Sequence, residues 1–280
     1  MNKIKMTPKI SVIMSVYNGQ DFLQASVKSI LNQTCSDFEF LIVDDASTDS
    51  SPVLLEGLAK SDNRIKIIKN QFNLGLTKSL NLALDQARGQ YIARLDADDL
   101  AYPDRLKHQL DFLENNPDYV LLGTAADVID DNCKVLFQIK PPTESEKIVK
   151  SLIKFNPFIH SSIMFRKSIV DLLGGYDSDL KYAQDYELYF RLINKGLLGN
   201  LSDVLVAYRD RQSSITAQKN RSQIKTVLKV QIRALYKKQY PIKCLVYLIK
   251  PILFLVFPLG LRRGLKRLKY FLNNFFFKNK

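Results

Sequence analysis

The sequence contains few of the residues on which several common kinds of site depend. Of its 280 residues, three are cysteine and two are histidine. The cysteines, Cys35, Cys133 and Cys244, are odd in number and widely separated, which argues against a disulfide framework or a thiolate zinc site and favours a reducing compartment. The histidines, His108 and His160, do not form a helical H-x-x-x-H pair, so a zinc hydrolase is not expected.

Three further motifs are missing. No G-x-G-x-x-G follows the first predicted strand and no G-x-x-x-x-G-K-[ST] occurs, so the sequence does not predict a dinucleotide oxidoreductase or a P-loop NTPase. No G-x-S-x-G occurs, which argues against an α/β-hydrolase. In the apolar stretch 242–261, the longest uncharged run is 251–261, which is shorter than the ~20 residues that a membrane-spanning helix needs.

Acidic residues are absent after Asp210. Residues 211–280 contain 17 Lys or Arg and no Asp or Glu, whereas residues 1–210 contain 24 basic and 28 acidic side chains. Such an asymmetry indicates an anionic partner, either nucleic acid or phospholipid. Residues 219–238 and 265–276 combine apolar stripes with basic residues, which is typical of helices that lie on an anionic membrane. The alternative is that these stripes dock on the protein itself. Nucleic acid is less expected, because no recognition motif accompanies the charge.

The first hundred residues alternate between apolar runs and amphipathic segments. This alternation predicts βαβ units and an α/β fold with a mostly parallel central sheet flanked by helices. Further strands are expected at 119–129 and 134–139, after a helix at 104–117. The predicted strands of the first hundred residues are 9–16, 38–47, 64–70 and 91–95, and the predicted helices are 21–31, 49–58 and 76–87.

Polar side chains follow three of these strands at the point where each strand ends. They are Tyr17 and Asn18, then Asp44 and Asp45, and finally the acids of Asp96–Asp99. Because ligands of open α/β sheets bind beyond the carboxyl ends of the strands, we expect these side chains to lie together. The last group is a D-x-D pattern, and carboxylates that share an ion with diphosphate oxygens suit Mg²⁺ or Mn²⁺. The alternative is an acidic loop that caps the following helix.

Seven motifs follow one another along residues 9–216. They read SVIMSVYNG, LIVDDASTDSS, NLGLTKSLNLAL, YIARLDADDLAYPDRL, NPFIHSSIMFRKS, GGYDSDLKYAQDYELYFRL and YRDRQSSIT. Together they resemble glycosyltransferase family 2, the inverting enzymes of the GT-A (nucleotide-diphospho-sugar transferase) fold. The resemblance implies a nucleotide-sugar-binding half at 9–105 and an acceptor and catalytic-base half at 106–216. A basic helical membrane-associating region is expected to follow at 217–280.

The resemblance also gives nucleotide-binding roles to matching positions. It implies that Asp45 contacts the base of the nucleotide and that Asp44 is its neighbour at the strand end. For Asn73, an N-cap of the following helix is an equally open interpretation. The positions expected at the nucleotide are Tyr17, Asn18, Asp44, Asp45, Asn73 and Gly75.

In the D-x-D motif, the resemblance implies that Asp96 faces the ribose or the donor sugar and that Asp98 binds the metal. Asp99 is a weaker metal or structural candidate. His160 matches a position near the acceptor, although a lone histidine in an apolar stretch is more often structural. Arg211 stands where many relatives have histidine, and it could pair with phosphate oxygens or be a solvated surface charge.

The catalytic base of the family is the aspartate of a Glu-Asp pair that opens a helix. Here the pair reads Gln184-Asp185, so the resemblance implies that Asp185 is the base. Loss of the neighbouring charge is expected to make Asp185 somewhat less basic. The alternative is that Asp185 only complements the positive end of its helix.

These features predict a metal-dependent hexosyl- or N-acetylhexosaminyl-type transferase of bacterial polysaccharide or lipopolysaccharide synthesis. It would move a sugar from a nucleotide-diphosphate sugar, a UDP-sugar or a dTDP-sugar, to a saccharide or lipid-linked saccharide at the cytoplasmic face of a membrane. One alternative is a GT-A-like nucleotidyltransferase, but YNGQDF lacks the glycine- and lysine-rich phosphate loop that such an enzyme usually needs. The other is a non-enzymatic basic protein that binds membrane or nucleic acid.

Overall fold

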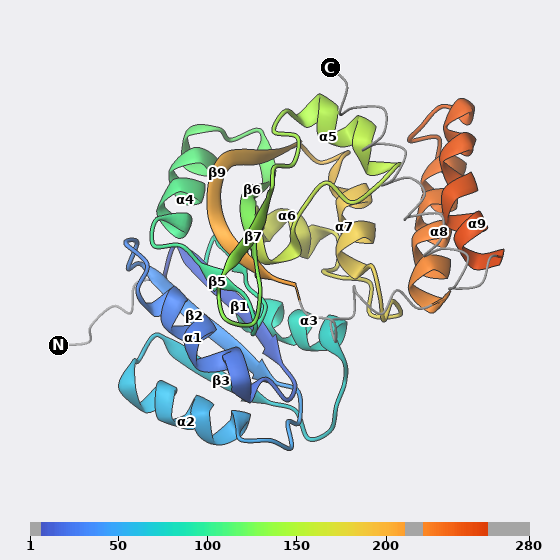
Figure 1. Cartoon of the computed structure of the whole chain (residues 1–280). Helices are drawn as coiled ribbons and strands as arrows, with labels where there is room; N and C mark the ends of the chain where they lie inside the picture. Colours follow the sequence, from blue (N-terminus) through green and yellow to red (C-terminus); the bar gives the residue numbers. More distant parts are fainter. Residues whose placement is uncertain (1–6, 211–220, 257–280) are drawn as a thin grey trace, which may run out of the picture. The chain divides into compact units, whose positions relative to one another are not determined.

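The computed structural model describes residues 7–210 and 221–256, and the chain divides into two compact units, residues 1–217 and 218–280 (Figure 1). The first unit is built around a nine-stranded sheet. Its strands are β1 (Ile10–Val16), β2 (Phe38–Asp44), β3 (Ile65–Lys69), β4 (Tyr91–Arg94), β5 (Leu100–Ala101), β6 (Tyr119–Ile129), β7 (Val135–Ile139), β8 (Met164–Arg166) and β9 (Leu197–Arg209).

Helices connect and cover these strands (Figure 1). In the first half of the unit they fall where the sequence predicts them. The helices of the unit are α1 (Gln20–Leu31), α2 (Ser51–Ser61), α3 (Leu76–Gln86), α4 (Arg105–Asn115), α5 (Ser145–Leu152), the short 3₁₀ helix η1 (His160–Ser162), α6 (Lys167–Leu172) and α7 (Gln184–Leu192).

The sheet has the order β3-β2-β1-β4-β8-β6-β9-β5, and β7 pairs with β6. The strands β3, β2, β1 and β4 are parallel to one another, as expected for strands joined by helical crossovers. The register pairs Val16 with Asp44, so β1 and β2 end side by side. This edge of the sheet therefore collects the polar residues that follow both strands.

The second half of the sheet is mixed, whereas a mostly parallel sheet was expected. Strand β8 is antiparallel to β4 and β6, β7 is antiparallel to β6, and β5 is antiparallel to β9. The strands β6 and β7 are joined by a tight turn, and such a connection can only form a hairpin. β9 runs parallel to β6, with register shifts along the pairing. The parallel prediction thus applies to β1–β4 and to the pair β6–β9.

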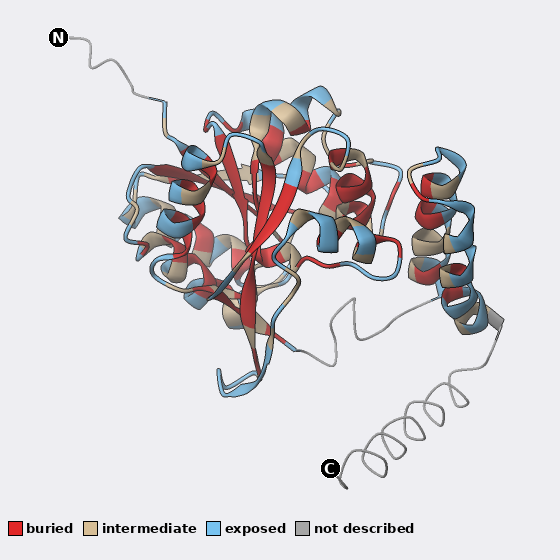
Figure 2. Cartoon of the chain, turned by 90° about the horizontal axis from the view of Figure 1, so that it is seen from above, coloured by how far each residue is buried: buried red, intermediate tan, exposed pale blue. Residues whose placement is uncertain are grey.

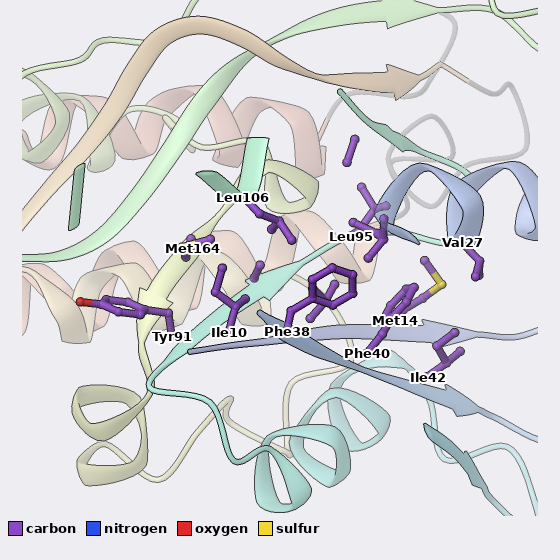
Figure 3. Packing of buried hydrophobic residues seen from close by; sticks show 14 of the residues in the cluster. Ile10, Met14, Val27, Phe38, Phe40, Ile42, Tyr91, Leu95, Leu106 and Met164 are labelled. Carbon is purple, nitrogen blue, oxygen red and sulfur yellow. The ribbon is translucent and has the colours of Figure 1, made fainter. Parts of the chain in front are cut away.

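A large cluster of core residues lies on one face of the parallel strands (Figure 3). Alternate residues of β1 and β2 point to this face and meet the apolar side of α1 and of α4, which explains the helical spacing of the apolar residues in both helices. The labelled core residues are Ile10, Met14, Val27, Phe38, Phe40, Ile42, Tyr91, Leu95, Leu106 and Met164.

The second unit contains α8 (Arg221–Tyr236), the 3₁₀ helix η2 (Ile242–Leu248) and α9 (Ile249–Val256), and α8 packs against the other two. Ile224, Val230 and Ala234 of α8 are buried. Along η2 and α9, by contrast, large aliphatic side chains are exposed (Figure 2). Among the described residues, no helix has both the length and the apolar character needed to cross a bilayer.

Candidate active site

The loops that follow β1 and β2 are hydrogen-bonded to each other. The backbone N–H of Asn18 donates to Ser47 Oγ at 3.0 Å. The side-chain oxygen of Asn18, Oδ1, accepts from the backbone N–H of Thr48 at 2.8 Å. Asp44 Oδ1 accepts from the N–H of Ser47 at 3.0 Å. Tyr17 is left 53% exposed at the same strand end. Asn18 and Asp44, which follow or end two neighbouring strands, are therefore connected through Ser47.

Asp45 joins a third loop to this surface. Its buried carboxylate accepts hydrogen bonds from Asn70 Nδ2 at 2.7 Å, from the N–H of Leu74 at 2.8 Å and from the N–H of Gly75 at 2.9 Å. The exposed Asn73 is thereby brought to the end of β2. Gly75, with a φ of 85°, is the N-cap residue of α3 and no side chain caps this helix, so the N-cap interpretation of Asn73 is wrong.

The acids of the D-x-D motif form a cluster directly after β4. Asp96, Asp98 and Asp99 each offer a carboxylate oxygen within 4.8 Å of the others. Both oxygens of Asp96 accept hydrogen bonds from the buried guanidinium of Arg94, and Ser161 Oγ donates to Asp96 Oδ2 at 2.9 Å. The charge of Asp96 is therefore already balanced by the protein.

Arg209, at the end of β9, holds the other side of this loop. Its N–H donates to Asp99 Oδ1 at 2.7 Å and its Nε donates to the carbonyl of Asp98 at 2.9 Å. Its guanidinium carbon lies 4.3 Å from the centre of the Phe22 ring. The acidic loop does not cap the following helix, because α4 begins at Arg105 with Asp104 in the N-cap position.

The donor set of this loop fits a divalent cation. Asp99 Oδ2 is buried and has no hydrogen-bond partner among the described residues. Burial, together with the charges of Asp96 and Asp98, raises the pKa of Asp99 well above its usual value. An oxygen-ligated cation would relieve both effects, since hard cations take carboxylate oxygens. Asp98 and Asp99 are the residues that could hold it.

Asp185 lies in the first turn of α7. The helix follows Ala183, which has a left-handed φ of 55°, and Gln184 is buried at its start. Asn156 Nδ2 donates to Asp185 Oδ2 at 2.8 Å. Burial raises the pKa of Asp185 above its usual value, although hydrogen bonds from the Tyr186 N–H and from Asn156 oppose the rise. The effect of Gln184, in place of a glutamate, on the basicity of Asp185 stays a prediction.

His160 is paired within the protein. Its Nε2 lies 3.0 Å from the hydroxyl of Tyr176, and the two rings are in edge contact. Burial and the nearby charge of Arg94 lower the pKa of His160 well below its usual value, so the ring is neutral. This environment favours the structural interpretation. Arg211 lies outside the described residues.

Among the residues of the site that were not predicted from the sequence are Arg94, Arg209 and Asn156. A signal existed for Arg94, because it stands two residues before Asp96 and alternate residues of an extended chain share a side. No local signal marks Arg209 or Asn156. Each makes its contacts across many residues of chain, 111 in the case of Arg209 and Asp98 and 29 in the case of Asn156 and Asp185.

The sheet, the strand-end carboxylates and the helix that carries Asp185 define a glycosyltransferase with a GT-A-like fold. Residues 11–174 match the family model described as "Glycosyl transferase family 2". The chain therefore belongs to glycosyltransferase family 2.

Relatives of known name extend over most of the chain. EpsE of Bacillus subtilis is 34% identical over 250 residues, which are 88% of this chain and 88% of EpsE. The O-antigen biosynthesis glycosyltransferase WbnJ of Escherichia coli is 33% identical over 75% of this chain and 83% of WbnJ. The amylovoran biosynthesis glycosyltransferase AmsE of Erwinia amylovora is 29% identical over 82% of this chain and 86% of AmsE.

Solved structures share the fold. S. aureus TarS 1–349 in complex with UDP-GlcNAc superimposes with a TM-score of 0.65 at 20% identity, over 79% of this chain and 66% of that one. The chain spans 64% of the same TarS fragment in complex with UDP and 39% of full-length TarS.

Proposed function

We propose that this protein is an inverting glycosyltransferase that moves a sugar from a UDP-sugar to a hydroxyl of a saccharide or lipid-linked saccharide. We further propose that it serves cell-surface polysaccharide or lipopolysaccharide synthesis. One observation carries the proposal: the buried guanidinium of Arg94 pairs with Asp96, and its charge also acts on Asp185. The expected donor motif and the expected base thus belong to one electrostatic unit. The names of WbnJ and AmsE support the pathway class, and the UDP-GlcNAc complex of TarS supports the donor class.

In this proposal the nucleotide lies against the surface where β1, β2 and β3 end. Asp45 contacts the base, and Asp96 faces the ribose or the donor sugar. Arg211 pairs with diphosphate oxygens. The other nucleotide-binding residues are Tyr17, Asn18, Asp44, Asn73 and Gly75.

Asp185 is the proposed general base. As the acceptor oxygen forms its bond to the anomeric carbon, its proton passes to the Asp185 carboxylate. The bond between the anomeric carbon and the UDP oxygen breaks on the opposite side, and its electron pair leaves with UDP. Displacement from the opposite side inverts the configuration of the anomeric carbon. A raised pKa suits this role, because it makes the carboxylate a better proton acceptor.

Asp98, with Asp99 as the second candidate, would hold Mg²⁺ or Mn²⁺. When bound, such a cation offsets the negative charge that develops on the departing diphosphate. The buried Asp99 oxygen without a partner supports this assignment.

The activity can be tested with the full chain and a set of nucleotide sugars. We expect release of UDP from at least one UDP-sugar in the presence of Mn²⁺ or Mg²⁺ and a saccharide or lipid-linked acceptor, and we expect a chelator to abolish the release. An Asp98→Asn variant should lose most of it. Release of pyrophosphate from a sugar phosphate and a nucleoside triphosphate would indicate a nucleotidyltransferase instead. No turnover of any donor would contradict the proposal.

We also infer that residues 217–280 associate peripherally with the cytoplasmic face of an anionic membrane. Support comes from the 17 basic and no acidic side chains of residues 211–280 and from the exposed aliphatic side chains of η2 and α9. Basic residues draw such a surface to anionic lipid, and aliphatic residues then enter the interface. The exposed aliphatic residues are Ile242, Leu245, Val246, Ile249, Ile252 and Leu253.

Vesicle sedimentation tests this inference. The full chain should bind vesicles that contain phosphatidylglycerol and should bind pure phosphatidylcholine vesicles less well. Leu245→Asp should weaken binding, whereas Val53→Asp, at an exposed apolar position of α2, should not. Equal binding by both variants would indicate that another occupant covers the surface.

A further inference from the structure

The chain segment that follows α5 lies along the face of α7 that carries Asp185. The Tyr186 hydroxyl donates to the carbonyl of Leu152, and the Phe158 ring lies 4.8 Å from the Tyr189 ring, centre to centre. Asp185 and Tyr189 are one helical turn apart and share a face of α7. The segment is therefore held against the helix on both sides of Asn156.

The orientation of the Asn156 amide is fixed by two contacts of opposite kind. Its Oδ1 accepts from the N–H of Phe158 at 3.1 Å, while its Nδ2 donates to Asp185 Oδ2 at 2.8 Å. A flipped amide would set oxygen against the carboxylate and NH₂ against the N–H, and both contacts would be repulsive. The N–H of Phe158 requires the amide oxygen on its side, so the NH₂ group of Asn156 faces Asp185.

A hydrogen bond from an amide N–H favours the ionised form of a carboxyl group. The other titratable groups near Asp185 are Arg94 of β4, Tyr176 before α7 and Tyr189 of α7 itself. Both tyrosines have raised pKa values, mainly through burial, and are neutral at physiological pH. Asn156 and Arg94 therefore oppose the rise that burial causes in the pKa of Asp185.

We propose that Asn156 is a positioning residue, which orients the Asp185 carboxylate and keeps it ionised for proton transfer from the acceptor. This inference rests on the proposed role of Asp185 as the base. It adds a second residue to the base, one that lies 29 positions earlier in the chain on a different element.

The test is the pH profile of kcat/KM for the full chain, with Asn156→Ala and Asn156→Asp. Loss of the hydrogen bond should raise the pKa of Asp185, so the acid limb of Asn156→Ala should move up by about one pH unit. Asn156→Asp keeps the shape and the acceptor for Phe158, but it puts a negative charge beside Asp185. Its acid limb should move further. Both variants should regain activity at high pH, where Asp185 is ionised without this hydrogen bond, and the deficit that remains there reports the lost orientation. KM for the donor should be unchanged.

Asn115→Ala is the matched control, because Asn115 is an exposed asparagine on α4 that donates to the carbonyl of Asp111. Its profile should superimpose on that of the wild type. An Asn156→Asp profile whose acid limb is unshifted, whatever its height, would overturn the proposal, because the ionisation of Asp185 would then not depend on Asn156. If Asp185→Asn is inactive, such an Asn156→Asp result rules out the role of Asn156 but leaves Asp185 as the proposed base. If Asp185→Asn keeps full activity, the proposed base and this inference both fail.

Discussion

The two units of the chain differ in the charged side chains that one buries and in the apolar side chains that the other exposes. In the first unit, Arg94, Arg105 and Arg209 are almost completely buried and their guanidinium groups are engaged by carboxylates or carbonyl oxygens. In the second, Tyr236 and Ile242 are 86% and 79% exposed. Burying a charge costs free energy unless the charge is paired, so the contacts of these three arginines are needed to offset their desolvation. The second unit exposes large apolar side chains to solvent.

The largest effect expected from a substitution in only one unit is on catalysis. Asp185→Asn should lower kcat by about 1000-fold, because general-base catalysis contributes factors of this order. Binding to phosphatidylglycerol vesicles should be unchanged, since the substitution lies in the first unit. The measurements are UDP release and vesicle sedimentation on the same preparation.

The reciprocal control removes the residues after Gln239. This truncation should move the protein from anionic vesicles to the supernatant and should retain turnover with a water-soluble acceptor. Loss of both properties in either variant would show that the two units do not act separately.

An intermediate effect is expected on stability. Leu23→Ala in α1 removes a fully buried side chain and should lower the free energy of unfolding by about 3 kcal/mol. The matched variant Leu245→Ala, at a position that is 47% exposed, should change it by less than about 0.5 kcal/mol. Urea denaturation gives both values. A similar loss in the two variants would mean that the aliphatic residues of η2 belong to a core.

The smallest effect concerns acid stability. Glu39 is buried in β2, where Lys66, Arg88 and Ser11 donate to its carboxylate. Although burial opposes the change, these partners lower the pKa of Glu39 to about 2 from an ordinary value of 4.5. A depressed folded-state pKa contributes stability above pH 4.5 that is lost as the pH falls toward 2.

Glu39→Gln should therefore cost about 2 kcal/mol at neutral pH and should flatten the decline in stability below pH 4.5. Urea midpoints measured across that range test the prediction. Glu56→Gln is the control, because Glu56 pairs with Lys69 at the surface. If the stability of Glu39→Gln falls as steeply below pH 4.5 as that of the wild type, the acid sensitivity comes from groups other than Glu39.

The strands β1–β4 and their helices could be predicted because their signals are local. Apolar runs buried on both faces mark β1 and β2, and helical spacing marks α1 and α3. The ends of β1 and β2 also predicted that Asn18 and Asp44 would lie in neighbouring loops. Strand β9 was not predicted, because polar Ser202 and Asp203 interrupt its apolar pattern and its place depends on pairing with the distant β6.

The supporting residues of the site illustrate the same limit. A single sequence gives no reason to place a charged side chain inside, so the burial of Arg94 and Arg209 could not be inferred from residue type. Their positions depend on which loops the fold brings together. The acids that follow β2 and β4 could be predicted from strand ends, whereas the positions of the cations that balance or fix them depend on tertiary structure.

The attachment of the loop after β3 has a consequence for how the family can diversify. Asp45 holds that loop partly through the main-chain N–H groups of Leu74 and Gly75. Main-chain donors remain whichever side chain a position carries, proline excepted. Exposed positions such as Phe72 and Asn73 can therefore accept new side chains while the anchor persists. Substitutions at these exposed positions should therefore change the surface of the loop with little loss of stability.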